Sequence, residues 1–254
     1  MPKHMITVEV QSQSRITEDI FSLVLKAGEI AGEAVPGQFV SLYSGDASRL
    51  LPRPISICQA EGEEIRFVYR MAGEGTKEFS TLMRGDSLRM VGPLGNGFPE
   101  TDQKAIMIGG GIGIPPLYFL AKQRQNPSDL AVLGYRDDAM FLLKEFGRTC
   151  DCRVATEDGS FGFHGNVVGL LRKEKIKADV IFSCGPLPML RALKEYAQEK
   201  KIRLYVSLEE RMASGVGACL GCVCRTTEPD EHSGVRYARV CKEGPVFDAE
   251  DVNL

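Results

Sequence analysis

The sequence predicts a β + α/β protein, in which an antiparallel β-barrel is followed by a parallel α/β domain and a small cysteine-rich segment. Three observations lead to this prediction. Short apolar runs fill the first hundred residues, strand-like and helix-like runs alternate over the next hundred, and four of the eight cysteines lie in the last 36 residues. Each pattern is typical of a different architecture.

Residues 1–100 are expected to form the barrel. Apolar runs recur about every ten residues, which is typical of a sandwich or small barrel. Turn-forming stretches such as KAGE, EGEE and RGD separate them, and GPLGNGFPETDQ ends the domain as a linker. The expected strands are ITVEV, FSLVL, QFVSLY, PISICQA, EIRFVYR and DSLRMVG.

Residues 101–208 are expected to form the α/β domain. The strand-like runs are AIMIGG, LAVLGYR, CRVATED, DVIFSCG and RLYVSL. The helix-like runs between them are PPLYFLAKQRQ, AMFLLKEFG and PMLRALKEYAQEKK. Alternation of this kind predicts a parallel sheet with helical crossovers.

Residues 209–254 are expected to form a separate small subdomain. They are rich in Gly and Cys and have few long apolar runs, so they cannot easily bury a core. A metal centre would supply the missing stabilisation, because ligand bonds fix the loop that carries them.

Composition excludes several classes of protein. The net charge of −3 argues against nucleic-acid binding, which usually needs a basic excess. No apolar run approaches about 18 residues, so no membrane span is expected. The N-terminus MPKHMITVEV is too short and polar for a secretory signal, and a cytoplasmic location is expected. In a reducing compartment, clustered cysteines more often bind metal or react than form disulfides.

Two glycine-containing turns lie between a strand and a helix of the α/β domain. The first contains Gly109, Gly110, Gly111 and Gly113, and the second is the stretch Ser183–Pro186 with Cys184 and Gly185. Such turns let the backbone approach a pyrophosphate, and the helix that follows offers unpaired N–H groups. One turn alone indicates either a dinucleotide site or a simple tight turn, whereas two at the same sheet edge favour a dinucleotide in a Rossmann-like domain.

Two stretches of the barrel contain groups that can hold phosphate. They are ArgProIleSer at 53–56 and GluGlyThr at 74–76. An Arg fork and a Thr or Ser hydroxyl are suitable for phosphate. Taken alone, each stretch is better explained as a surface Arg or a turn.

The strongest pattern is the cysteine group Cys219, Cys222, Cys224 and Cys241. Plant-type ferredoxin loops use C-x4-C-x2-C and a remote cysteine. Cys219 and Cys222 supply the x2 pair, Cys241 is the remote ligand, and the x4 spacing places the first ligand at Ser214. A four-cysteine zinc site and simple apolar burial of the thiols are the alternatives.

In the order in which they occur, these motifs resemble the electron-transfer subunits of dihydroorotate dehydrogenase B, within the ferredoxin-NADP reductase superfamily. The resemblance covers about Val8 to Val252. It rests on RPIS at 53–56, VYR at 68–70, GEGT at 73–76, GPLGNGF at 92–98, GGGIGIPPL at 109–117, CGPLPM at 184–189, SLEERM at 207–212, GACLGCVC at 217–224 and VCKEGPVF at 240–247.

The resemblance implies FAD in the barrel, NAD in the α/β domain and a [2Fe–2S] cluster in the tail. The implied FAD residues are Arg53, Pro54, Ile55, Ser56, Val68, Tyr69, Arg70, Gly75 and Thr76. The implied NAD residues are Gly109, Gly110, Gly111, Gly113, Cys184, Gly185 and Pro186. No general acid or base is required of this chain, and His4, His164 and His232 are given no role.

The resemblance also implies a partner. In this family an FMN-containing catalytic subunit oxidises dihydroorotate to orotate in pyrimidine biosynthesis. Electrons pass from that FMN through the cluster and FAD to NAD+, and the complex contains two copies of each subunit. The alternatives are a subunit of a related NADH-dependent ferredoxin-NADP reductase or sulfide dehydrogenase complex, and a zinc-bearing dinucleotide sensor.

One position departs from the family, which has a cysteine where this chain has Ser214. Three interpretations follow. Ser214 ligates iron through oxygen and lowers the cluster potential, Cys224 takes its place, or the cluster is labile or absent. Ser214 is preferred, because only one residue separates Cys224 from Cys222 and because a related reductase family has an aspartate at this point.

Overall fold

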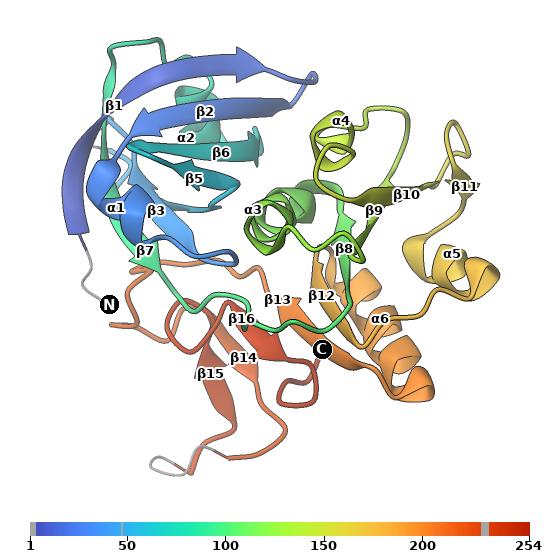
Figure 1. Cartoon of the computed structure of the whole chain (residues 1–254). Coiled ribbons are helices and arrows are strands. Elements are labelled where there is room, and N and C mark those ends of the chain that lie inside the picture. Colours follow the sequence, from blue (N-terminus) through green and yellow to red (C-terminus); the bar gives the residue numbers. More distant parts are fainter. Residues whose placement is uncertain (1–3, 47, 230–233) are drawn as a thin grey trace.

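The computed structural model describes residues 4–46, 48–229 and 234–254, so His232 lies outside the described residues. Two seven-stranded sheets make up most of the chain, and the C-terminal segment packs beneath both (Figure 1). The two sheets account for the predicted barrel and α/β domain.

The first sheet is antiparallel, with strand order β4-β3-β7-β1-β2-β6-β5. Its strands are β1 (His4–Arg15), β2 (Ile20–Lys26), β3 (Phe39–Tyr43), β4 (Arg53–Ser56), β5 (Gln59–Glu61), β6 (Glu64–Arg70) and β7 (Ser87–Leu94). The sheet curls until β4 contacts β6 and encloses a core that includes Leu23, Phe67 and Phe79. Every strand predicted in the first hundred residues is present, and the run PISICQA is divided between β4 and β5.

Two short helices of this domain were not predicted. They are α1 (Gly28–Glu33) and α2 (Glu74–Phe79). The stretch KAGE was assigned to a turn because it contains glycine and charged residues. Ile30 is nevertheless fully buried against the barrel core, and this packing holds α1 despite the weak helix propensity of its two glycines.

The second sheet has the order β11-β10-β9-β8-β12-β13-β16. Its parallel strands are β8 (Ala105–Gly110), β9 (Leu130–Tyr135), β10 (Asp151–Thr156), β11 (Phe163–His164), β12 (Val180–Cys184) and β13 (Arg203–Ser207). The chain runs outward from β8 to β11 and returns to β12 beside β8. The crevice at this switch point is where open α/β sheets bind ligands.

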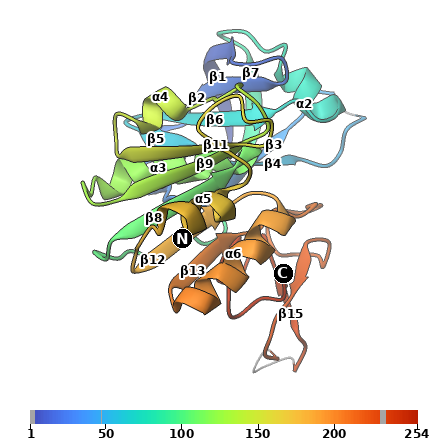
Figure 2. The ribbon, with the colours of Figure 1, turned by 90° about the vertical axis from the view of Figure 1, so that its right-hand side faces the viewer.

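Helices cover both faces of this sheet. They are α3 (Ile114–Arg124), α4 (Leu143–Phe146), α5 (Val167–Glu174) and α6 (Leu187–Lys200) (Figure 2). Residues of α3 and α4 share one buried cluster, and residues of α5 and α6 share another. Helix α4 is shorter than the predicted run AMFLLKEFG, and α5 was not predicted.

The α/β domain contacts the barrel through α3 and α4. Phe119 of α3 is part of the barrel core. Arg66 of β6 donates two hydrogen bonds to the Glu145 carboxylate of α4, at 2.5 and 3.0 Å. These contacts fix the edge of the barrel against the switch-point crevice.

The C-terminal segment contains β14 (Val223–Arg225), β15 (Tyr237–Arg239) and β16 (Val246–Asp248). Strands β14 and β15 form their own ladder, but β16 pairs antiparallel with β13 and so extends the second sheet. Val240 and Cys241 lie in the same buried cluster as Ile106 and Val206 of that sheet. The segment therefore shares the core of the α/β domain.

Candidate functional site

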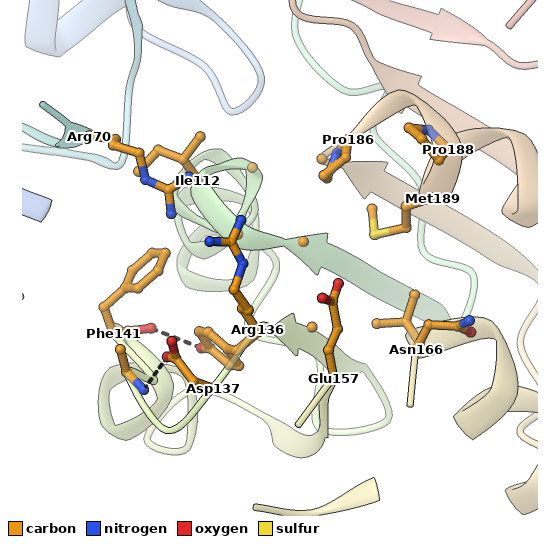
Figure 3. Close-up of a pocket in the computed structure, with 18 of the residues that line it drawn as sticks. Arg70, Ile112, Arg136, Asp137, Phe141, Glu157, Asn166, Pro186, Pro188 and Met189 are labelled. Carbon is orange, nitrogen blue, oxygen red and sulfur yellow. Dashed lines mark hydrogen bonds between the residues drawn. The ribbon is translucent and has the colours of Figure 1, made fainter. Parts of the chain in front are cut away.

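A cavity of about 730 Å³ lies between the barrel and the carboxyl ends of the parallel strands. Its walls come from the β1–β2 turn, the end of β6, the two glycine turns and the segments after β9 and β10. Figure 3 shows Arg70 and Ile112 on one side of it and Glu157 and Asn166 on the other. A volume of this size suits a ligand pocket.

The two glycine turns pack directly on each other. A Cβ at Gly113 would lie 2.5 Å from the carbonyl of Cys184, and one at Gly110 would lie 2.7 Å from Met189 Sδ. Only glycine permits this approach at Gly113, where the obstacle is backbone, whereas a side chain at Gly110 would have to displace that of Met189. The packing brings the start of α3 beside the start of α6, and Pro115 and Pro116 occupy the first turn of α3.

Five of the predicted dinucleotide residues line the cavity, namely Gly110, Gly111, Gly113, Gly185 and Pro186. Gly109 and Cys184 are paired with each other in the sheet beneath it. The Cys184 side chain is 1% exposed, and burial raises the pKa of its thiol. The structure therefore gives Cys184 a backbone position at the turn and a side chain in the core.

Sequence reasoning missed several charged residues of the cavity. Arg136 and Glu157 follow the ends of β9 and β10, and Glu209 follows β13. Glu209 is exposed to the cavity, and the protein that crowds around it raises the pKa of its carboxyl. Their position in the sequence was the available signal, because each residue lies one or two residues after the end of a parallel strand, at the edge of the sheet that binds ligands.

The predicted FAD residues come together where β4, β6 and α2 meet. The four residues of β4 are all half-buried. The Arg53 side chain lies over Gly75 so closely that a Cβ there would overlap its guanidinium. Thr76 Oγ1 accepts hydrogen bonds from the N–H groups of Ala72 and Gly73, which fixes the start of α2.

Alternation along β6 separates the side chains of its last three residues. Tyr69 is 2% exposed, stacks on Phe21 and accepts a hydrogen bond from Gln13 Nε2 at 2.9 Å. The Tyr69 side chain thus belongs to the barrel core and leaves only its backbone for a cofactor. Arg70 lines the cavity and pairs with Asp19 at 2.9 Å. Val68 is buried against the second domain.

The predicted cluster ligands group in two pairs. Ser214 Oγ lies 3.4 Å from Cys219 Sγ. The Cys241 N–H donates to Cys222 Sγ at 3.4 Å, and the two thiols also interact. Hydrogen bonds from Ser214 and from the Gly221 N–H lower the pKa of the Cys219 thiol to about 7.

Cys224 takes part in neither pair. Its backbone pairs with Ala238 in the β14–β15 ladder, and its side chain packs on the buried cluster of the α/β domain. Burial raises the pKa of its thiol. Across the described parts of the chain, no three His, Cys, Asp or Glu side chains converge as ligands of a single metal ion.

The loop that carries Ser214 and Cys219 packs on the barrel. Gly215 lies against Ser41 of β3, where an added Cβ would be 2.6 Å from Ser41 Oγ. That hydroxyl is buried and has no hydrogen-bond partner among the described residues. Arg239 donates to the Gly217 carbonyl at 2.8 Å and holds the loop from the other side.

Known proteins resemble the chain over nearly its full length. The family model "Iron-sulfur cluster binding domain of dihydroorotate dehydrogenase B" matches residues 209–253. A protein of Bacillus velezensis named "Dihydroorotate dehydrogenase B (NAD(+)), electron transfer subunit" is 41% identical over 96% of this chain and 97% of its own length. A protein of Bacillus cereus with the same name has the same identity and coverage.

The chain belongs to the family of dihydroorotate dehydrogenase B electron-transfer subunits. A solved NADH-dependent reduced ferredoxin-NADP oxidoreductase has the same fold as this family member. The TM-score is 0.86 at 28% identity, over 97% of this chain and 89% of that chain. Among the described residues, no helix is long and apolar enough to cross a membrane.

The residues of this family member fit the three groups that the resemblance implies. The cavity and glycine turns fit a dinucleotide, and Arg53, packed on Gly75, offers a guanidinium of the kind that holds phosphate. A binuclear cluster takes two ligands per iron, so two separate pairs suit it better than the compact group that zinc requires.

Proposed function

We propose that the chain is the electron-transfer subunit of a dihydroorotate dehydrogenase B, which delivers electrons from dihydroorotate to NAD+. The observation that carries the proposal is the paired ligand set, Ser214 with Cys219 and Cys222 with Cys241, on a loop packed against the barrel. The family membership and the match over residues 209–253 support it.

The three proposed domains have separate tasks. Residues 1–100 would hold FAD, residues 101–208 NAD and residues 209–254 the cluster, with β16 joining the second sheet. The flavin exchanges hydride with nicotinamide and single electrons with an iron–sulfur cluster, which is why it belongs between them. The chain supplies position, with Arg53 and Thr76 for FAD and the two glycine turns for the dinucleotide.

In this proposal Ser214 and Cys219 ligate one iron and Cys222 and Cys241 the other. The separate position of Cys224, paired in β14 and packed on the core, supports Ser214 as the fourth ligand. An alkoxide is a harder donor than a thiolate, so this cluster would have a lower potential than an all-cysteine one.

The proposed partner is the catalytic subunit that the name of the relatives implies. We propose that it contains FMN and that the complex has two copies of each subunit. A cytoplasmic location is part of the proposal, since all eight cysteines are free thiols and would persist in a reducing compartment.

Co-expression tests the proposal. The chain and a dihydroorotate dehydrogenase catalytic subunit from the same genome should co-purify and reduce NAD+ when dihydroorotate is added. The similarity to a ferredoxin-NADP oxidoreductase favours one second candidate, a subunit of such a complex. A chain that binds no catalytic subunit but exchanges electrons between NADH and ferredoxin would support that candidate and contradict the first.

A further inference from the structure

Three charged side chains of the cavity, Arg136, Glu157 and Glu209, have no hydrogen-bond or ion-pair partner among the described residues. Glu209 follows β13, whereas Arg136 and Glu157 follow the paired ends of β9 and β10. Backbone hydrogen bonds hold these paired ends together, from the Glu157 N–H to the Tyr135 carbonyl and from the Asp158 N–H to the Arg136 carbonyl, both at 3.2 Å. Figure 3 shows the Arg136 and Glu157 side chains extending into the cavity.

Arg136 and Glu157 are both exposed to solvent, where an ion pair between them would contribute little, so both charges are free to bind a ligand. A ligand that carries an anion near one and hydroxyl donors near the other would satisfy both. A dinucleotide does so, with its diphosphate and its ribose hydroxyls.

The direction of the dinucleotide in the cavity follows from the fold. The nicotinamide must reach the barrel, so it takes the end of the cavity near Arg70 and Asp19. The diphosphate lies over the glycine turns at the switch point. The adenosine half is then left with the end that contains Glu157 and Asn166, which Figure 3 shows on the far side from Arg70.

We infer that the Glu157 carboxylate accepts a hydrogen bond from the 2′-hydroxyl of the adenosine ribose and selects NAD(H) over NADP(H). The inference rests on the proposed function. An ionised carboxylate only accepts hydrogen bonds, which suits a hydroxyl, and it repels the two negative charges of a 2′-phosphate. A carboxylate reads this hydroxyl in other NAD-binding folds.

The neighbouring acid is not available for this role. Asp158 Oδ1 accepts hydrogen bonds from the N–H of Ser160 at 2.9 Å and from its hydroxyl at 2.7 Å. Asp158 is not among the residues that line the cavity, and its Oδ1 is held in this turn, which makes Asp158→Asn a matched control. Arg136 is assigned to the diphosphate, which NAD and NADP share.

Binding of two redox-inactive probes, ADP-ribose and 2′-phospho-ADP-ribose, tests the inference. Calorimetry on the FAD-loaded protein should show that the wild type prefers ADP-ribose. Glu157→Gln should weaken ADP-ribose binding about tenfold and Glu157→Arg should reverse the preference. Asp158→Asn should leave the preference as it is, and Arg136→Ala should weaken both probes equally.

Several outcomes would overturn the inference. It is wrong if Glu157→Gln keeps the full wild-type preference while both variants retain the flavin spectrum. It is also wrong if Arg136→Ala loses only the 2′-phosphorylated probe, since Arg136 would then read that phosphate. A wild type that binds neither probe would contradict the proposed function itself, and the inference with it.

Discussion

The dinucleotide turns and the cluster loop are built in opposite ways. The turns lie between buried strands and helices, and Gly113 of the first turn packs on the backbone of Cys184 and Gly185 in the second. The cluster loop, residues 209–222, is fully described and contains no helix or strand. We therefore expect the fold alone to form the first site, and the second site to need bonds to its metal in addition to the few contacts that its loop makes with the protein.

We expect only the cluster loop to depend on the metal. Strand β16 pairs with β13, and Lys194 of α6 donates to the Val252 carbonyl at 2.7 Å. These contacts belong to the fold and do not require metal. Loss of the cluster should therefore release residues 209–222 and leave the C-terminus attached.

The largest expected effect comes from removing a buried cluster ligand. Cys222→Ala should lose nearly all iron and sulfide, and a protease should then cut within 209–222, because ligand bonds hold this loop. Bound FAD should be retained. Metal analysis and mass spectrometry of the digest measure both effects. Cys152→Ala removes a half-buried thiol elsewhere and should change neither the iron content nor the cleavage. Iron retained in Cys222→Ala would contradict the claim that Cys222 is a cluster ligand.

The next largest effect is expected at Ser214, the proposed fourth ligand of the cluster. Ser214→Ala should lose most of its iron, whereas Ser214→Cys should keep the cluster and raise its reduction potential, because thiolate is the softer donor. Cys224→Ala should keep its iron. Iron content and EPR of the reduced proteins measure the outcome. A Cys224→Ala protein without cluster beside a Ser214→Ala protein with it would assign the ligand to Cys224.

A smaller effect is expected at the dinucleotide turns. Gly113→Ala places a methyl group 2.5 Å from the Cys184 carbonyl, so the two turns must separate. NADH should bind roughly tenfold to hundredfold more weakly, as expected for an overpacked contact. The iron content should not change. Gly32→Ala, where an added Cβ meets nothing within 4 Å, is the control; equal NADH affinities in the two variants would refute this account.

The smallest effect is expected at the domain junction. Glu145→Gln removes the partner of Arg66 across the junction, and the pair is partly exposed, so unfolding free energy should fall by about 1 kcal/mol. Flavin reduction by NADH should slow, because Arg66 and Glu145 fix the barrel against the crevice. Glu174→Gln breaks an ion pair within the α/β domain and should leave the rate unchanged. Equal rates in both variants would show that the junction does not position the nicotinamide.

Much of the fold could be predicted because its signals are local. Alternating apolar runs predicted the barrel strands, and the glycine turns lie at the sheet edge where the sequence put them. The helix α1 and strand β16 could not be predicted, since Ile30 and Val246 gain their burial from residues far away in the chain.

Part of the site could also be predicted, because some of its residues lie in local sequence motifs. Gly113 and Cys222 lie in motifs whose spacing has a direct chemical meaning. Arg136 and Glu157 belong to no motif, and only the sheet order brings their strands to the cavity. The burial of Tyr69 likewise follows from the alternation of β6, whose inward face could not be assigned from the sequence alone.

The most direct test of the central claim is a count of cofactors in protein purified without air. The account predicts one FAD, two irons and two sulfides per chain, and NADH should bleach the flavin and produce the EPR signal of a reduced binuclear cluster. A colourless protein that contains one zinc per chain and no sulfide would contradict it.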